Sequence, residues 1–136
     1  MTDTLKEIGR RFTLAFVAGD FAVLDEVAAE GIVDHDAPPG AEPGRVGLHD
    51  AVAMFQQAFP DLETTIEHVF AEGDTVAVHG RAVGTHNGPL LGAPPTGRRA
   101  GFSYVDIFRV EGGKVVEAWH VEDMAGLLAQ LGLLPV

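Results

Sequence analysis

The first sixty residues repeat their apolar side chains at the spacing of an α-helix. The pattern predicts a helix over residues 4–18, opened by the capping-box pair Thr4 and Glu7. A second, shorter helix is predicted to end near Gly31, and a third covers residues 46–59. Between these two helices the chain predicts a brief strand and a loop rich in proline, glycine and acid.

From residue 62 the apolar period changes to two, which is typical of strands with one polar face. Strands are predicted over residues 62–70 and 75–85, joined by a tight turn. The loop over residues 86–97 follows and carries Leu90 and Leu91 between prolines. We expect both leucines to be exposed and to form the lip of a cavity, because apolar loop residues favour contact with a ligand.

Residues 102–123 predict a β-hairpin with a glycine-containing turn. If the turn has three residues, 111–113, Asp106 and His120 lie on one face of the hairpin as diagonal neighbours. A two-residue turn at positions 112–113 would shift the register by one and separate them. We therefore make the three-residue turn part of the prediction.

Helices followed by antiparallel strands indicate an α+β domain. We expect three N-terminal helices to cover one face of a curved, mainly antiparallel sheet, and a short C-terminal helix over residues 124–131 to close the chain. The result is a cone with an apolar interior and a mouth. At 136 residues the chain is expected to be a single domain, residues 1–136.

Composition and net charge limit which kinds of binding partner are expected. The net charge is −11 and the sequence pI about 4.7, so nucleic acid and anionic membranes are not expected partners. No apolar run approaches the roughly 20 residues of a membrane helix, and the first residues lack the pattern of a signal peptide. We expect a cytoplasmic protein that binds a neutral or weakly acidic apolar molecule.

Two titratable residues of the hairpin are candidates for acid and base chemistry. Asp106 stands in an aromatic stretch, where a carboxylate is costly to bury unless it is paired or protonated. His120 can take and give a proton near neutral pH. Either residue could instead be a structural side chain with satisfied hydrogen bonds. Asp123 could face the cavity or cap the following helix.

A metal site is not expected. His35 lies between Asp34 and Asp36, and His79 lies near Arg81 and His86, but no spacing predicts three or four convergent ligands. The glycine-rich loops do not match phosphate-binding patterns, and no serine stands in a nucleophile elbow.

Several segments resemble the SnoaL-like polyketide cyclase family of the NTF2-like superfamily. They are AFVAGDFAVLDEV, VDHDAPPG, FQQAFPDL, AEGDTVAVHGRAVGTHNGPLLGAPPTGR, DIFRVEGGKVVEAWHVED and GLLAQLG. The resemblance implies a cone-shaped α+β barrel with an apolar cavity. It also implies a homodimer or homotetramer that needs no metal and no organic cofactor.

The resemblance also implies site residues. In the cyclases an aspartate near the end of the last strand removes a proton α to a carbonyl, and a histidine on the preceding strand assists. Matching the hairpins puts these positions at His120 and Asp106, so the two residue types are swapped here. His120 would be the base and Asp106 would fix its tautomer, while Tyr104 or His79 could hydrogen-bond the enolate.

We therefore predict a cofactor-independent polyketide cyclase or isomerase acting by general acid and base chemistry on an apolar, polyketide-like substrate. The alternatives are a hydroxylase-like or hydrolase-like relative acting on an epoxide or lactone, and a non-catalytic binding protein. The predicted catalytic residues are His120, Asp106 and Asp123. The predicted substrate contacts are His35, Asp34, Phe55, His79, Tyr104, Phe102, Trp119, Leu90 and Leu91.

Overall fold

A computed structural model describes residues 2–134, which contain four helices and five strands. Within that range every helix is too short or too polar to cross a lipid bilayer. In chain order the elements are α1 (Thr2–Ala18), α2 (Phe21–Val27), β1 (Ala28–Asp34), α3 (Gly44–Ala58), β2 (Glu63–Glu72), β3 (Thr75–Thr85), β4 (Arg99–Glu111), β5 (Lys114–Glu122) and α4 (Met124–Gln130).

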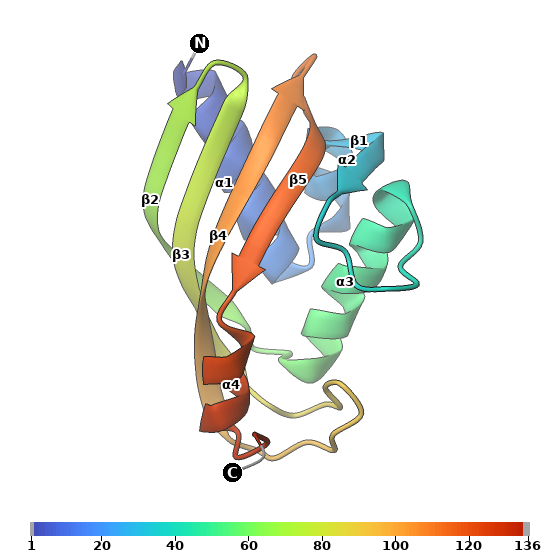
Figure 1. Cartoon of the computed structure of the whole chain (residues 1–136), viewed down its shortest axis with the longest axis vertical. Coiled ribbons are helices and arrows are strands. Elements are labelled where there is room, and N and C mark those ends of the chain that lie inside the picture. The colour runs from blue at the N-terminus through green and yellow to red at the C-terminus, as the bar shows by residue number, and fades with distance from the viewer. Residues whose placement is uncertain (1, 135–136) are drawn as a thin grey trace.

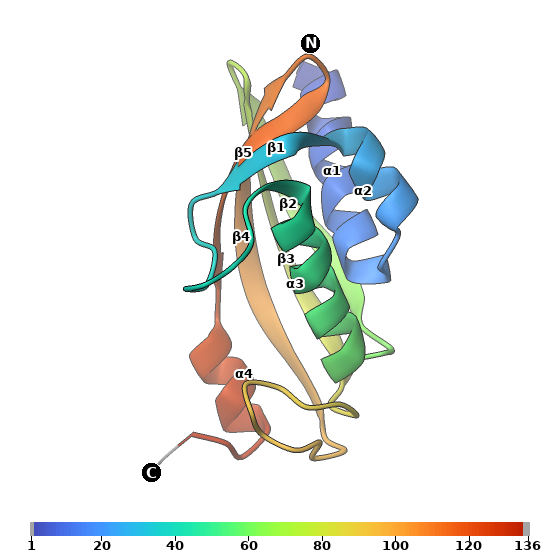
Figure 2. The same ribbon diagram turned by 90° about the vertical axis from the view of Figure 1, so that its right-hand side faces the viewer.

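The strands form one curved, open sheet in the order β1-β5-β4-β3-β2 (Figure 1). Strand β1 is parallel to β5, and the other neighbours are antiparallel. Figure 2 shows α1, α2 and α3 on the same side of this sheet, with α4 at its lower end. The predicted α+β cone, with three helices against a mainly antiparallel sheet, is confirmed.

Helix α1 packs its apolar stripe directly on the sheet. The ring of Phe12 lies 4.5 Å from the ring of Phe108 on β4, measured between centroids. Gly9 lets the helix approach β3, because a Cβ at this position would lie 3.0 Å from a methyl group of Val76. Val52 of α3 is fully buried, so a second helix closes the core from the side.

The register of the β4–β5 hairpin differs from the prediction in its turn. The turn has two residues, Gly112 and Gly113, with φ of 61° and 79°, as a type I′ turn requires. The register then shifts by one, because Val110 faces Val115 while the preceding residue of β4 faces Glu117. The extra residue at position 116 is a β-bulge, which reverses the effect of the shorter turn.

As a result Asp106 and His120 lie directly opposite each other, not diagonally. Both side chains are on the face that the helices cover, as predicted. A two-residue turn was expected to separate them, and the bulge explains why it does not. The bulge also buries Val115 fully, whereas Val116 was predicted to share the inner face.

The strand after α2 begins earlier in the chain than predicted. Helix α2 ends at Val27, not near Gly31, and β1 starts at Ala28. The chain gains backbone hydrogen bonds to the β5 edge here, so pairing overrides the local helical pattern. Parallel alignment places Asp34 beside Ala118, two residues before His120.

The loop over residues 86–97 does not expose both leucines. Leu91 is 69% exposed, but Leu90 is 1% exposed and belongs to the core. The backbone N–H groups of Asn87 and Gly88 donate to the carbonyl of Ala58 at the end of α3, which draws the loop against the helix. Burial of Leu90 follows from this attachment, which the sequence pattern did not reveal.

Candidate active site

A cavity of about 1190 Å³ lies between the inner face of the sheet, helices α1 and α3, and the loop after β1. Its wall is mostly apolar, and acidic and hydroxyl side chains are also among its lining residues. The loop over residues 37–43 contributes prolines and small residues to the wall. This loop, and not the leucine loop, is therefore the lip of the cavity. The aromatic residues of the wall are Phe12, Phe16, Phe55, Phe102, Tyr104 and Phe108.

His120 on β5 is held between two carboxylates. Its Nδ1 lies 2.5 Å from Glu122 Oε1, and its Nε2 lies 3.0 Å from the carboxylate of Asp34. Glu122 shares the inner face because it stands two residues further along the same strand. The sequence analysis assigned the orientation of the ring to Asp106, but the ring nitrogens bond Asp34 and Glu122 instead.

The end of β1 fixes this arrangement. Asp34 Oδ1 accepts a hydrogen bond of 2.9 Å from the backbone N–H of Asp36. Asp36 in turn accepts one of 2.9 Å from the backbone N–H of His120. The two aspartates thus tie the start of the cavity loop to β5, so the loop and the imidazole are positioned together.

The hydrogen bonds set the charge of His120. The hydrogen bond from the ring to Asp34, and to a smaller extent the one to Glu122, raise the pKa of His120 to about 10, against the opposing effect of burial. Burial raises the pKa of Asp34, but its hydrogen bonds to His120 and to the Asp36 backbone, together with the nearby positive charge, outweigh burial and lower the net pKa. His120 is therefore an imidazolium at neutral pH and cannot accept a further proton.

Asp106 has the opposite character. Burial raises the pKa of Asp106 to about 7, and the negative charge of Glu122 adds to this effect, while His120 opposes it. Its carboxyl group lines the cavity beside apolar surface. A carboxyl that titrates near neutral pH is suited to both take and give a proton.

Thr13 of α1 adds a hydroxyl to the same part of the wall. Its side chain is 3% exposed and lines the cavity. Among residues 2–134, its Oγ1 has no hydrogen-bond partner of good geometry, although the hydroxyl is near enough to Asp106 to lower that carboxyl's pKa. A buried hydroxyl without a partner costs free energy, so a bound ligand that accepts its proton would be favoured.

Tyr104 reaches the cavity but its hydroxyl is already engaged. It lies 2.6 Å from Thr64 Oγ1, which donates to the carbonyl of Arg81 at 3.1 Å. Because Thr64 has one proton to donate, Tyr104 must be the donor in their bond. Tyr104 can therefore accept a hydrogen bond from a ligand more readily than donate one.

Half of the twelve predicted site residues line the cavity. Those in its wall are Asp34, Phe55, Phe102, Tyr104, Asp106 and His120. Asp123 instead caps α4, since its Oδ1 accepts a bond of 2.9 Å from the N–H of Gly126. Leu90 lies in the core and Leu91 on the surface, away from the wall.

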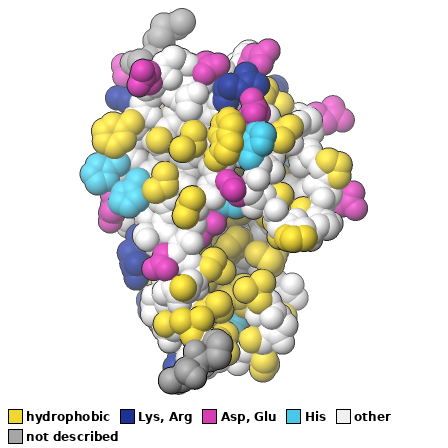
Figure 3. Space-filling view, in the orientation of Figure 1, with side chains coloured by type: hydrophobic (Ala, Val, Ile, Leu, Met, Phe, Trp, Pro, Cys, Tyr) yellow, Lys and Arg dark blue, Asp and Glu magenta, His cyan; other side chains and the backbone are white. Residues whose placement is uncertain are grey.

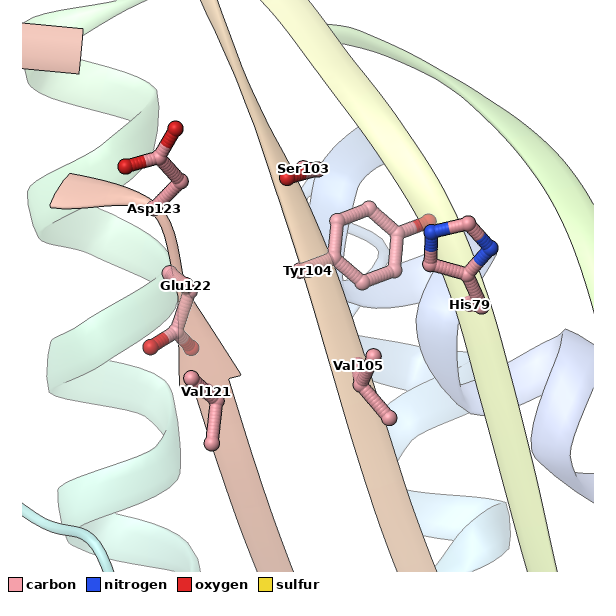
Figure 4. A pocket seen from close by; sticks show the side chains of 7 residues that line it. All are labelled: His79, Ser103, Tyr104, Val105, Val121, Glu122 and Asp123. Atoms are coloured by element: carbon pink, nitrogen blue, oxygen red, sulfur yellow. The ribbon is translucent and has the colours of Figure 1, made fainter. Parts of the chain in front are cut away.

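The remaining predicted residues lie on the outer face of the sheet. The ring of His35 stacks on Trp119 with centroids 4.6 Å apart, and His35 Nε2 lies 2.6 Å from Glu117. His79 borders a shallow depression of about 370 Å³ together with Val105 and Val121 (Figure 4). These residues come from neighbouring strands and face away from the cavity.

Sequence reasoning missed three features of the site. Glu122 was not among the predicted site residues, although its even-numbered position places it beside His120 on the inner face. Thr13 follows Phe12 on α1, and a single hydroxyl in an apolar stripe was a signal that could have been used. The cavity loop gave no comparable signal, because a proline-rich segment does not show which element it covers.

The family model described as SnoaL-like polyketide cyclase matches residues 6–131. The chain belongs to the SnoaL-like polyketide cyclase family. Among curated proteins no matching relative was found.

Solved structures of SnoaL-like and related proteins share the fold. IdmH, a proposed polyketide cyclase from Streptomyces antibioticus, is 34% identical, covers 94% of this chain and 98% of its own, and has a TM-score of 0.81. TsrD from Streptomyces laurentii is 30% identical over 97% of both chains, with a TM-score of 0.88. AclR, a proposed hydroxylase from Streptomyces galilaeus, is 29% identical over all of this chain and 89% of its own, with a TM-score of 0.86.

Proposed function

We propose that the protein is a polyketide cyclase or isomerase in which Asp106 is the general acid and base and His120 is a fixed positive charge. The observation that carries the proposal is the direct pairing of Asp106 with His120 across the β4–β5 ladder, on the wall of a large apolar cavity. This assignment exchanges the roles that the sequence analysis gave to the two residues.

The reason for the exchange is the state of each group before substrate binds. Both ring nitrogens of His120 are engaged by carboxylates, so the ring has no free lone pair. The Asp106 carboxyl, with a pKa of about 7, is substantially ionised at neutral pH. Asp106 is therefore the better proton acceptor, even though imidazole is the commoner base in proteins.

An intramolecular aldol reaction illustrates the chemistry. Asp106 removes a proton from a carbon α to a carbonyl, and the resulting enolate carbon forms a bond to a second carbonyl carbon of the same molecule. The oxygen of that second carbonyl takes the proton from Asp106, so the product is an isomer of the substrate. The hydroxyl of Thr13 can donate to the enolate oxygen, and the imidazolium of His120 lowers the energy of the developing negative charge.

The test uses a linear poly-β-ketone and follows its conversion by liquid chromatography and mass spectrometry. We expect a cyclised product of equal mass, or one lighter by one water if the aldol dehydrates. Asp106→Asn should lower kcat/KM by on the order of 10²- to 10⁴-fold. Asp74→Asn, which makes the same change in an exposed turn, is the control and should leave kcat/KM unchanged.

The pH profile separates Asp106 from other bases. Because the base acts when deprotonated, kcat/KM should rise with pH through about 7, the pKa of Asp106. Asp106→Asn should remove this limb. Full activity of Asp106→Asn, or an unchanged limb in the variant, would show that another group is the base. Binding without conversion across a panel of poly-β-ketones would favour a non-catalytic binding protein.

A second candidate function is hydrolytic opening of an epoxide or lactone. The clustering of Asp106 with the Asp34–His120–Glu122 group favours it, because such a group can hold a water molecule against a substrate. Asp106 would take a proton from water as the hydroxide attacks carbon and the bond from that carbon to the ring oxygen breaks, and the ring oxygen would then receive the proton from Asp106. The product would then be heavier by one water, which distinguishes hydrolysis from cyclisation in the same assay.

The homodimer or homotetramer implied by the resemblance remains a prediction. The outer face of the sheet supports it, because Phe70 and Val121 are 67% and 73% exposed on that face. Figure 3 shows hydrophobic side chains gathered over the same strands. Light scattering coupled to size-exclusion chromatography would measure the mass in solution.

A further inference from the structure

A second cluster of polar side chains lies on the outer face of the sheet, away from the cavity. It consists of Glu67 and His68 on β2 and His79 on β3, and we call it the β2–β3 cluster. The potential ligand atoms of all three residues lie within 4.8 Å of one another. Histidine side chains over this hairpin are visible on the surface in Figure 3.

A β-bulge assembles the cluster. Ile66 pairs with Gly80 and His68 pairs with His79, so Glu67 is an extra residue in β2. In a regular strand, Glu67 and His68 would point to opposite faces. Both are instead exposed, whereas the residues on either side of the pair are partly buried. Bulges re-aim side chains, and this one turns both residues toward His79.

The distances within the cluster match those of a metal site. His68 Nδ1 and His79 Nδ1 are 3.0 Å apart, and His79 Nδ1 is 3.6 Å from Glu67 Oε2. Ligands about 2.0–2.1 Å from a tetrahedral zinc ion are separated by about 3.3–3.4 Å. The two measured separations lie on either side of this value, so small side-chain rotations would admit an ion.

The chemistry of the donors also favours a cation. Two imidazoles and one carboxylate form a donor set that binds zinc and similar divalent metals, and histidine coordinates through Nδ1 as well as Nε2. The rings of His68 and Phe70 are nearly parallel, with centroids 5.9 Å apart and an interplanar angle of 10°. The net charge of −11 adds a general attraction for cations.

We propose that Glu67, His68 and His79 bind a divalent transition-metal ion such as Zn²⁺ at the outer face of the sheet. The three side chains supply three ligands, and the remaining coordination positions face outward, toward water or a group from another molecule. The site is separate from the proposed reaction, because His79 faces away from the cavity that contains Asp106.

The test is titration of the tag-free full-length protein with ZnCl₂ by calorimetry, and with CoCl₂ by visible absorption. We expect one ion per chain, with affinity reduced at least about tenfold in His79→Gln and in His68→Gln. His49→Gln is a matched control, because His49 is a surface histidine that pairs with a carboxylate, Asp25, at 2.7 Å. This control should bind the metal as the unmodified protein does.

Two results would overturn the proposal. One is the absence of saturable binding up to about 1 mM free Zn²⁺, which corresponds to a binding free energy weaker than about −4 kcal/mol. The other is binding that survives in both His68→Gln and His79→Gln. Circular dichroism of each variant checks that the fold is retained, and Glu67→Gln gives an independent test of the third ligand.

Discussion

Replacing Asp106 by asparagine is expected to stabilise the fold at alkaline pH while it removes activity. Asparagine keeps the size of the side chain and resembles its protonated form. The native state raises the pKa of Asp106 from 3.8 to about 7, chiefly because the group is buried. Between these two values the native state holds a proton that the unfolded chain has lost, so stability falls as pH rises through this window.

The structure gives the size of the effect. Each pKa unit corresponds to about 1.4 kcal/mol, so ionised Asp106 costs the native state roughly 4 kcal/mol above pH 7. At about pH 5 Asp106 lowers the free energy of unfolding by roughly 1.7 kcal/mol, since the unfolded carboxyl is ionised while the native one is protonated. The gain in unfolding free energy from Asp106→Asn should therefore be about 2–3 kcal/mol larger at pH 8 than at pH 5.

Urea denaturation at the two pH values measures this difference directly. Asp74→Asn controls for the loss of one negative charge from a strongly acidic protein, and its effect should change little between the two conditions. A gain from Asp106→Asn that is equal at both pH values would refute the reasoning. It would mean that Asp106 has similar pKa values in the native and unfolded states, and the case for Asp106 as a base near neutral pH would fail with it.

Two further outcomes follow from the structure. Asp34→Asn should lower the His120 pKa from about 10 toward 6.5, and Glu122 should keep it above 6.5. NMR titration of the imidazole measures this pKa. A pKa unchanged by the substitution would contradict the hydrogen bonding described here. Gly80→Ala should lower the unfolding free energy by about 1–3 kcal/mol, because a Cβ there would lie 2.5 Å from the Tyr104 hydroxyl and 2.6 Å from the carbonyl of Thr65. Gly31→Ala, where nothing within the described chain lies closer than 4 Å to an added Cβ, is the control in thermal denaturation.

Most of the fold could be predicted from apolar periodicity. The helical spacing of Phe12 and its neighbours is a local property that survives in the structure, and the alternation along β2 survives as far as Ile66, where a bulge interrupts it. The end of α2 and the start of β1 could not be predicted in this way. Ala28 becomes part of a strand because it pairs with Val115, which is 87 positions later in the chain. The conformational preferences of the residues near Ala28 do not reveal a pairing partner so far along the chain.

The candidate site was only partly accessible from the sequence. Asp106, His120 and Asp34 could be proposed from their residue types and positions, and all three line the cavity. Their protonation could not be inferred, because it depends on which carboxylate each group meets. Two carboxylates bond His120, whereas burial is the main effect on the pKa of Asp106, and the proposed acid and base roles are therefore the reverse of those expected from the two side chains in isolation.

Two bulges connect these observations. An extra residue at position 116 of β5 restores the register that brings His120 opposite Asp106. An extra residue at position 67 of β2 turns Glu67 and His68 to the same side as His79. A strand shifted by one residue moves every following side chain to the other face. Without the bulge in β5, the two-residue turn would put His120 on the outer face of the sheet, the face of the metal site proposed above, and not in the cavity. The distribution of histidines between the two faces therefore depends on irregularities of the sheet that a strict period of two does not reveal.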